Sequence, residues 1–108
     1  MKLIQTSIQK EEYYEIQYYD ITVDGSRVGE CQIITDDDYT YLERIDIDEA
    51  HQSKGYGTRV IGELKDMLDV SELIAAPDNA DCQRWMERIG EENNDGLPVD
   101  QGFGVYEI

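Results

Sequence analysis

The segment from Asp46 to Leu68 constrains the fold most, because it reads as a strand, a glycine turn and a helix in direct succession. The strand ends near Ile47, the turn is Gly55-Tyr56-Gly57, and apolar residues at helical spacing follow from Val60. A helix that opens from a glycine turn presents free backbone amides at its N-terminus, and this geometry can hold a pyrophosphate. The segment therefore predicts a site for an anionic ligand.

The distribution of charge points to the same segment. The chain has 25 acidic residues among 108, yet residues 50–62 contain none and include Lys54 and Arg59. A local excess of positive charge in an acidic chain favours an anion at that place. The glycines alone are also compatible with an ordinary tight turn, so the prediction depends on their position and on the charge around them.

The overall charge limits the classes of partner. With 108 residues the chain has the length of one domain, 1–108, and its net charge is −16. Phosphate contacts need a basic surface, so this charge argues against a nucleic-acid partner. The acidity is compatible with adaptation to high salt or general solubility, with attraction of a basic substrate, and with imitation of DNA.

The sequence predicts a cytoplasmic protein without a metal site. No apolar run is long enough for a membrane span or for the core of a signal peptide. Cys31 and Cys82 lack metal-ligand spacing and are expected as reduced core residues. His51 is the sole histidine and cannot form a zinc site or a catalytic triad by itself.

Runs of β-branched and aromatic residues predict six strands. They cover residues 3–8, 14–23, 27–35, 39–47, 73–76 and 103–108. Asp24-Gly25 lies between the second and third runs, and this pair is a strong signal for a hairpin with a two-residue turn. Strict alternation in the fourth strand would place four of its side chains on one face. These are Tyr41, Glu43, Ile45 and Ile47.

Helical periodicity predicts two helices. The first follows Gly57, and the second has its cap at Asp78 or Asn79 and its end at Gly90. Residues 91–101 are expected to form a polar loop. The first apolar stripe is Val60, Ile61, Leu64, Met67 and Leu68, and the second is Cys82, Trp85, Met86 and Ile89.

The order of these elements predicts an α/β fold with a mixed sheet, of the α+β kind. An antiparallel N-terminal meander is followed by a βαβ crossover, a second helix and a C-terminal strand. Crossovers between parallel strands are right-handed, so the same hand is expected here.

Two common phosphate-binding motifs are absent. A dinucleotide fingerprint would need a third glycine where Val60 stands, and a Walker-type loop would need a lysine and a hydroxyl residue after Gly62. Instead, residues 52–57, Gln-Ser-Lys-Gly-Tyr-Gly, resemble the Q/R-x-x-G-x-G/A signature of GNAT-type N-acyltransferases. Downstream, the run from Asn79 through Cys82, Trp85 and Met86 to Gly90 is similar to the family's second signature, N-x-x-A-x-x-F-Y-x-x-x-G-F. The resemblance covers residues 16 to 108.

The resemblance implies a GNAT-like fold and acetyl-CoA as co-substrate. The loop amides and the helix dipole would bind the pyrophosphate, and Lys54 and Arg59 would add side-chain charge. Main-chain groups of the fourth strand would bind the pantetheine arm, and Asn79 would orient that arm or cap its helix. The implied cofactor-binding residues are Ile45, Ile47, Gln52, Ser53, Lys54, Gly55, Tyr56, Gly57, Thr58 and Asn79.

The resemblance also implies transfer of an acetyl group to a primary amine. The amine must lose a proton, and Glu43 is the candidate base; the alternative is an ordinary exposed carboxylate. Tyr41 would steer the acceptor. His51 is interpreted as a loop residue at the rim of the site, and Trp85 as a core residue.

Two departures from the family open alternatives. Met86 stands where many relatives carry the tyrosine that protonates the departing thiolate, so the acid would be Tyr56, Tyr106 or water, or none. Two functions stay open: the chain is an N-acetyltransferase, or alternatively it is a CoA-binding module that acts through a protein partner.

The second departure lies before the first hairpin, where the family's acceptor wall is not evident. An open acceptor face suits a protein lysine or N-terminus, and a second copy in a homodimer could supply the wall.

Overall fold

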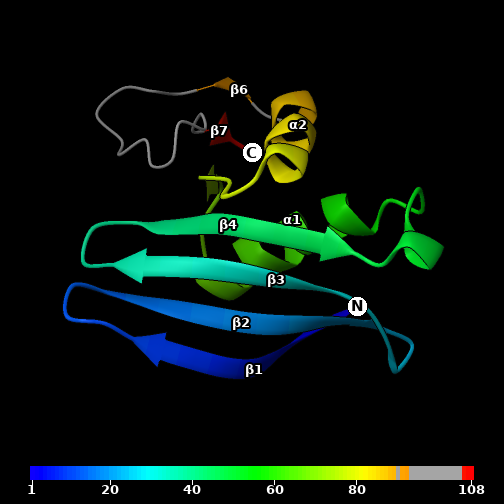
Figure 1. Cartoon of the computed structure of the whole chain (residues 1–108), viewed down its shortest axis with the longest axis horizontal. Coiled ribbons are helices and arrows are strands. Elements are labelled where there is room, and N and C mark those ends of the chain that lie inside the picture. The colour runs from blue at the N-terminus through cyan, green and yellow to red at the C-terminus, as the bar shows by residue number, and fades with distance from the viewer. Residues whose placement is uncertain (90, 93–105) are drawn as a thin grey trace.

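The structure is a computed structural model, and it describes residues 1–89, 91–92 and 106–108. In this part of the chain one sheet has the strand order β1-β2-β3-β4-β5-β7-β6 (Figure 1). The strands are β1 (Lys2–Lys10), β2 (Tyr14–Val23), β3 (Ser26–Asp36), β4 (Thr40–Ile47), β5 (Ile74–Ala75), β6 (Glu91–Glu92) and β7 (Tyr106–Glu107). The helices are the 3-10 turn η1 (Glu49–His51), α1 (Tyr56–Leu68) and α2 (Ala80–Ile89). The α/β prediction with a mixed sheet is confirmed.

The N-terminal meander has the predicted form. β1 pairs antiparallel with β2, β2 with β3, and β3 with β4. The turn between β2 and β3 has φ values of 52° at Asp24 and 82° at Gly25. Two central residues with positive φ are typical of the two-residue hairpin turn whose twist matches that of the strands. The Asp-Gly prediction is therefore confirmed, and the first strand is longer than the predicted 3–8.

The crossover from β4 through α1 to β5 is parallel, as predicted. Tyr41 pairs with Ile74 and Leu42 with Ala75. β5 is shorter than the predicted 73–76, and it is followed by Pro77, which has no N–H to donate to a ladder. β7 then pairs antiparallel with β5.

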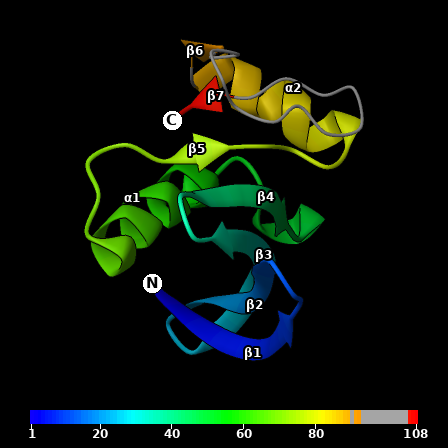
Figure 2. The same cartoon turned by 90° about the vertical axis from the view of Figure 1, so that its left-hand side faces the viewer.

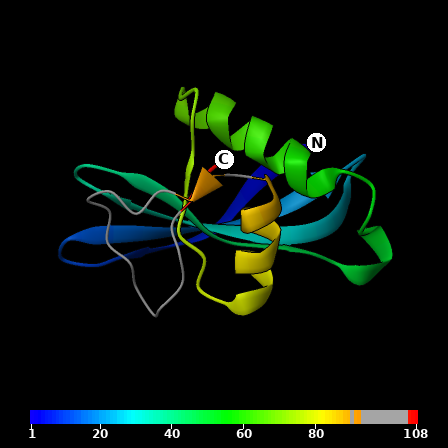
Figure 3. The same cartoon turned by 90° about the horizontal axis from the view of Figure 1, so that it is seen from above.

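The two helices lie on opposite sides of the sheet (Figures 2 and 3). The buried residues of α1 are Val60, Ile61 and Leu64, which belong to one core cluster with strand residues such as Ile33. Leu68 is partly buried against this cluster. Met67 was predicted on the same stripe, but it is 45% exposed. At about 100° per residue it lies at the margin of the apolar arc, so its side chain points past the sheet.

One of the two residues predicted to cap the second helix is its N-cap. The N–H of Cys82 donates to Asn79 Oδ1 at 2.9 Å, so Asn79 is the cap rather than Asp78. Cys82 and Met86 are buried and Trp85 is partly buried. The prediction of a loop over 91–101 is wrong at Glu91–Glu92, because this segment pairs with β7 as β6. The predicted helix end at Gly90, the rest of that loop and residues 103–105 lie outside the described residues.

No helix within the described ranges is long and apolar enough to span a membrane.

Candidate functional site

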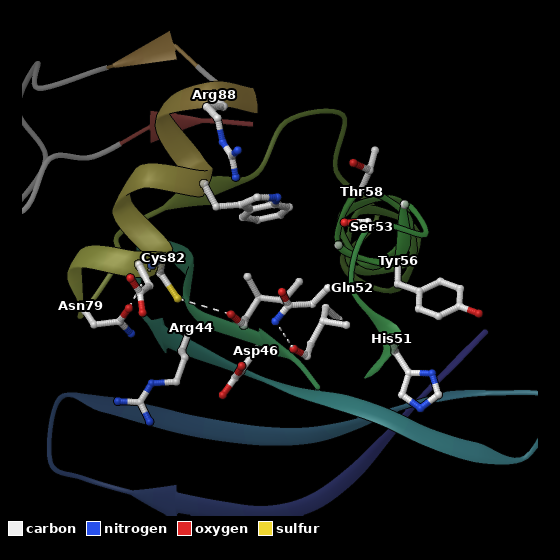
Figure 4. A pocket seen from close by; sticks show the side chains of 16 residues that line it. Arg44, Asp46, His51, Gln52, Ser53, Tyr56, Thr58, Asn79, Cys82 and Arg88 are labelled. Atoms are coloured by element: carbon white, nitrogen blue, oxygen red, sulfur yellow. Dashed lines mark hydrogen bonds between the residues drawn. The ribbon is translucent and has the colours of Figure 1, made fainter. Parts of the chain in front are cut away.

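A cleft of about 730 Å³ lies between the N-terminus of α1, the C-terminal half of β4 and one face of α2 (Figure 4). It brings together most of the residues predicted to bind a cofactor. These are Ile45, Ile47, Gln52, Ser53, Gly55, Tyr56, Gly57, Thr58 and Asn79. Lys54, Tyr41 and Glu43 do not line it.

The N-terminus of α1 opens into this cleft with unused donors. Gly55 is the N-cap in a left-handed conformation, with φ 77°, and makes no side-chain cap bond. The first helical bond is from Arg59 N to Gly55 O at 3.1 Å, so the N–H groups of Tyr56, Gly57 and Thr58 have no acceptor in the described part of the chain. The first turn contains no acidic residue. Free amides at the positive end of a helix favour an anion.

Gly57 has a second role that the sequence did not indicate. A Cβ built on Gly57 would lie 2.7 Å from Trp85 Cζ2, which is closer than carbon atoms approach. The bare Cα of Gly57 therefore allows the indole of α2 to pack against the first turn of α1. This contact joins the two walls of the cleft.

The floor of the cleft is the edge of β4. Asp48 N donates to Val28 O at 2.9 Å, so by alternation the main-chain groups of Ile45 and Ile47 point away from β3. On that side, pairing with the chain after β5 ends where Asp78 N donates to Glu43 O at 3.2 Å. β4 and the chain after β5 separate beyond this point.

Side chains already occupy the carbonyls of this edge. Cys82 Sγ donates to Ile45 O at 3.3 Å, and Gln52 Nε2 donates to Ile47 O at 2.9 Å. Burial raises the pKa of the Cys82 thiol, which stays protonated as a donor. The N–H groups of Ile45 and Ile47 are the main-chain groups left to face the cleft.

A β-bulge corrects the predicted faces of β4. Gln32 pairs with Arg44 but its neighbour Ile33 pairs with Leu42, so Glu43 is an extra residue in β4. The extra residue resets the alternation, and Leu42 rather than Tyr41 shares a face with Ile45. The prediction that Tyr41, Glu43, Ile45 and Ile47 share one face is therefore wrong.

Glu43 lies in a polar network at the point where the strands separate. Gln32 Nε2 donates to Glu43 Oε1 at 2.6 Å. Arg44 forms two bonds with Asp78, at 3.2 and 2.6 Å, and the Asp78 side chain is only 11% exposed. Burial and the nearby charge of Asp78 raise the pKa of Glu43, against the opposing effect of Arg44. Glu43 therefore holds a proton more readily than an exposed glutamate.

Tyr41 lies along the same strand and is buried. Its hydroxyl is buried and has no hydrogen-bond partner among the described residues. The rings of Tyr41 and Tyr39 have centroids 5.8 Å apart. Burial, and then the charge of Asp36, raise the pKa of Tyr41. Because this hydroxyl is buried and Tyr41 does not line the cleft, a ligand in the cleft does not reach it.

The cations of the cleft are not those that the sequence indicated. Lys54 and Arg59 do not line it, and the Arg59 guanidinium lies 5.8 Å from the centre of the Tyr56 ring. The cations that do line it are Arg44 and Arg88, and the imidazole of His51 lies in the lining as well. Sequence reasoning also missed Asp46 and Asp81 in the lining. Arg88 could have been found from its spacing, because it stands three residues after Trp85 on the same stripe of α2.

Four other residues with a predicted role have defined positions in the structure. Met86 is fully buried in the core and cannot donate a proton. Tyr106 is also buried, and its hydroxyl bonds to Glu87 Oε1 at 2.9 Å. Tyr56 lines the cleft at the loop. Asn79 both caps α2 and lines the cleft, so the two alternatives for it are compatible.

In the described ranges no group of three or more His, Cys, Asp or Glu side chains is placed to hold a metal ion.

Comparison with known proteins agrees with this geometry. Residues 3–90 match the model of the Acetyltransferase (GNAT) family. A solved structure with the same fold is a GNAT family acetyltransferase from Elizabethkingia anophelis with acetyl-CoA bound, at a TM-score of 0.56 and 12% sequence identity. The alignment covers 86% of this chain and 75% of that one. No curated protein matches the chain.

Proposed function

The chain belongs to the GNAT family of acetyltransferases, whose model matches residues 3–90, and from this premise we propose that it transfers the acetyl group of acetyl-CoA to a primary amine. The observation that carries the proposal is the set of open amides of Tyr56, Gly57 and Thr58 at the N-terminus of α1. They face a cleft that continues along the free edge of β4. A structural neighbour has acetyl-CoA bound.

The donors of the cleft match the chemistry of coenzyme A in order along its length. The open amides suit the pyrophosphate, and the helix dipole adds favourable charge. The N–H groups of Ile45 and Ile47 suit the amide carbonyls of the pantetheine arm. Asn79, Gln52 and Ser53 supply further polar contacts in the lining. When bound, acetyl-CoA supplies the acetyl group as a reactive thioester.

Glu43 is the proposed base. A primary amine is protonated at neutral pH and must lose a proton before its lone pair can attack a carbonyl carbon. The raised pKa of Glu43 brings its proton affinity closer to what a base needs near neutrality. Since Glu43 does not line the cleft itself, the proton would reach it directly from the acceptor side or through one water molecule. Tyr41 is left out of the proposal, because its hydroxyl is buried and its side chain does not line the cleft.

The acceptor is proposed to be a lysine or an N-terminus of a protein. The carboxylates of Glu43 and Asp78 lie next to each other at the point where the strands separate, and Arg44 balances only one of them. The net charge of −16 would also attract a cationic acceptor in the cytoplasm. A second copy that completes the acceptor site remains part of the proposal, and sedimentation velocity at high salt tests it.

A second candidate function is a CoA-binding module without turnover. Met86 favours it, because this residue is buried in the core where many relatives have the acid tyrosine. Both candidates require the same cofactor site, so binding alone does not separate them.

Product formation separates the two functions. Purified protein is incubated with acetyl-CoA and a panel of lysine peptides, peptides with free N-termini and polyamines, and products are read by mass spectrometry. Acetylated product with multiple turnovers supports the enzyme, and a matched Glu43→Gln sample should lose most of it. Binding of acetyl-CoA without product from any acceptor supports the module. Absence of binding contradicts both.

A further inference from the structure

Four residues of α2 line the cleft, and three of them stand at a regular spacing. Cys82, Trp85 and Arg88 are each three positions apart. Neighbours three apart lie about 60° from each other around a helix and about 4.5 Å apart along its axis, so the three residues form a row that slants along the helix. These side chains therefore mark three successive levels of one cleft wall.

Contacts across the cleft show what the first two levels face. Cys82 bonds to the carbonyl of Ile45, which belongs to the floor. Trp85 packs against Gly57, which belongs to the phosphate-binding turn of α1. Arg88 lies one further step along the helix, and Figure 4 shows its side chain directed from α2 into the cleft. Going outward along the cleft from β4, Arg88 therefore lies past the open amides of α1.

Arg88 is available for a ligand in a way that the other arginines of this region are not. Arg44 forms two bonds with Asp78, and Arg84 is paired with Asp81. Within the described residues the guanidinium of Arg88 has no ion pair or hydrogen bond. A basic residue in the last turn of a helix is favoured by the dipole, but that effect leaves the donors of the guanidinium unused.

We propose that Arg88 binds the 3′-phosphate of coenzyme A. This inference rests on the proposed function. Coenzyme A carries its thiol, pantetheine arm, pyrophosphate and 3′-phosphorylated adenosine in that order, and the three levels of the wall follow the same order. The planar guanidinium matches a phosphate through two parallel hydrogen bonds. The cleft therefore distinguishes coenzyme A from 3′-dephospho-coenzyme A, which lacks only this group.

Isothermal titration calorimetry with these two ligands tests the assignment. Wild-type protein should bind coenzyme A roughly tenfold more tightly than the dephospho form. This factor is at the lower end of what hydrogen bonds to a charged group contribute, because Arg88 is exposed to solvent. Arg88→Gln should bind both ligands equally, with the affinity that wild type has for the dephospho form. Arg88→Lys should keep part of the preference.

Arg84→Gln is the matched control, since it removes the same charge from an exposed position of the same helix that does not line the cleft. It should keep the preference for coenzyme A. Equal affinity of wild type for the two ligands overturns the proposal. So does an Arg88→Gln variant that weakens both ligands by the same factor, which would assign Arg88 to the pyrophosphate or to folding. If neither ligand binds wild type, the proposed function fails and this assignment fails with it.

Discussion

Substitution of Gly57 should have opposite effects on stability with and without the indole of Trp85. In the folded chain a Cβ at residue 57 would lie 2.7 Å from Trp85 Cζ2 and 3.3 Å from Cε2. In Gly57→Ala the indole must therefore move or the two helices must separate. Gly57 lies within α1, where alanine is also favoured over glycine by its backbone entropy.

The two effects can be weighed against each other. Overpacking of this kind costs about 1–3 kcal/mol. The change from glycine to alanine in a helix gains about 0.5–1 kcal/mol. The expected result for Gly57→Ala is a net loss of about 1 kcal/mol from the free energy of unfolding. In a Trp85→Leu background the shorter side chain no longer reaches residue 57, so the same substitution should gain about 0.5–1 kcal/mol.

Urea unfolding followed by far-UV circular dichroism measures these differences. A change of about 1 kcal/mol moves the midpoint by roughly 0.5 M at an m value of about 2 kcal/mol/M. Gly62→Ala is the matched control, because it lies in the same helix and an added Cβ meets nothing within 4 Å. It should stabilise both backgrounds equally. If Gly57→Ala changes stability by the same amount with and without Trp85, the contact between the two cleft walls does not exist in solution.

Substitutions at three further positions test other parts of the site. Gly55→Ala should lose about 1–2 kcal/mol of stability in urea unfolding although its Cβ meets no atom, because φ is 77° there, and Gly55→Asn should lose less; equal losses would contradict the backbone explanation. Asn79→Ala should lose about 1 kcal/mol with the cap bond to Cys82 N, while Asn79→Asp should retain most of it; an unchanged midpoint would rule out the cap. Glu43→Gln should reduce turnover at least about 100-fold without changing acetyl-CoA affinity, and wild-type turnover should rise with pH around a midpoint above the ordinary glutamate pKa. A wild-type rate in this variant would make Glu43 an ordinary carboxylate. The pKa of Glu43 is raised in the folded state, so its contribution to stability is present below the unfolded pKa and is lost as pH rises through the folded pKa. Over that rise in pH, Glu43→Gln should gain stability relative to wild type.

Local signals in the sequence predicted the meander, the crossover and the cofactor loop. The Asp24-Gly25 pair fixes its hairpin because both residues tolerate positive φ, and the observed angles agree. The stripe of Val60, Ile61 and Leu64 fixes the buried face of α1. Gly55 adopts the left-handed conformation that a glycine before a helix suggests. These features depend on a few adjacent residues, so one sequence is sufficient to predict them.

Features that depend on a distant partner could not be predicted. The bulge at Glu43 arises because its neighbours Arg44 and Leu42 pair with the adjacent residues Gln32 and Ile33 of β3, and a period of two cannot reveal an extra residue in one strand. Charge alone indicated Lys54 and Arg59, but neither side chain lines the cleft. Lys54 lies in the loop between Ser53 and Gly55, which both have positive φ, and Arg59 lies in α1 beside the Tyr56 ring.

Several residues of the cleft lining that the sequence did not indicate come from α2. Arg88 and Trp85 reach the cleft because α2 lies across from the N-terminus of α1. The position of α2 relative to α1 is set by the whole sheet. The helical spacing within α2 predicts only that Trp85 and Arg88 lie on the same face of this helix.

A titration of ¹⁵N-labelled protein with acetyl-CoA, followed by two-dimensional ¹H–¹⁵N NMR, tests the cofactor site residue by residue. We expect the largest shifts at the backbone amides of Tyr56, Gly57 and Thr58, with further shifts at Ile45 and Ile47 and at the indole N–H of Trp85. The chain contains one tryptophan, so the indole signal is assigned without ambiguity. Spectra that stay unchanged at millimolar acetyl-CoA, or shifts confined to residues outside the cleft, would contradict the cofactor site and with it the proposed acetyltransfer.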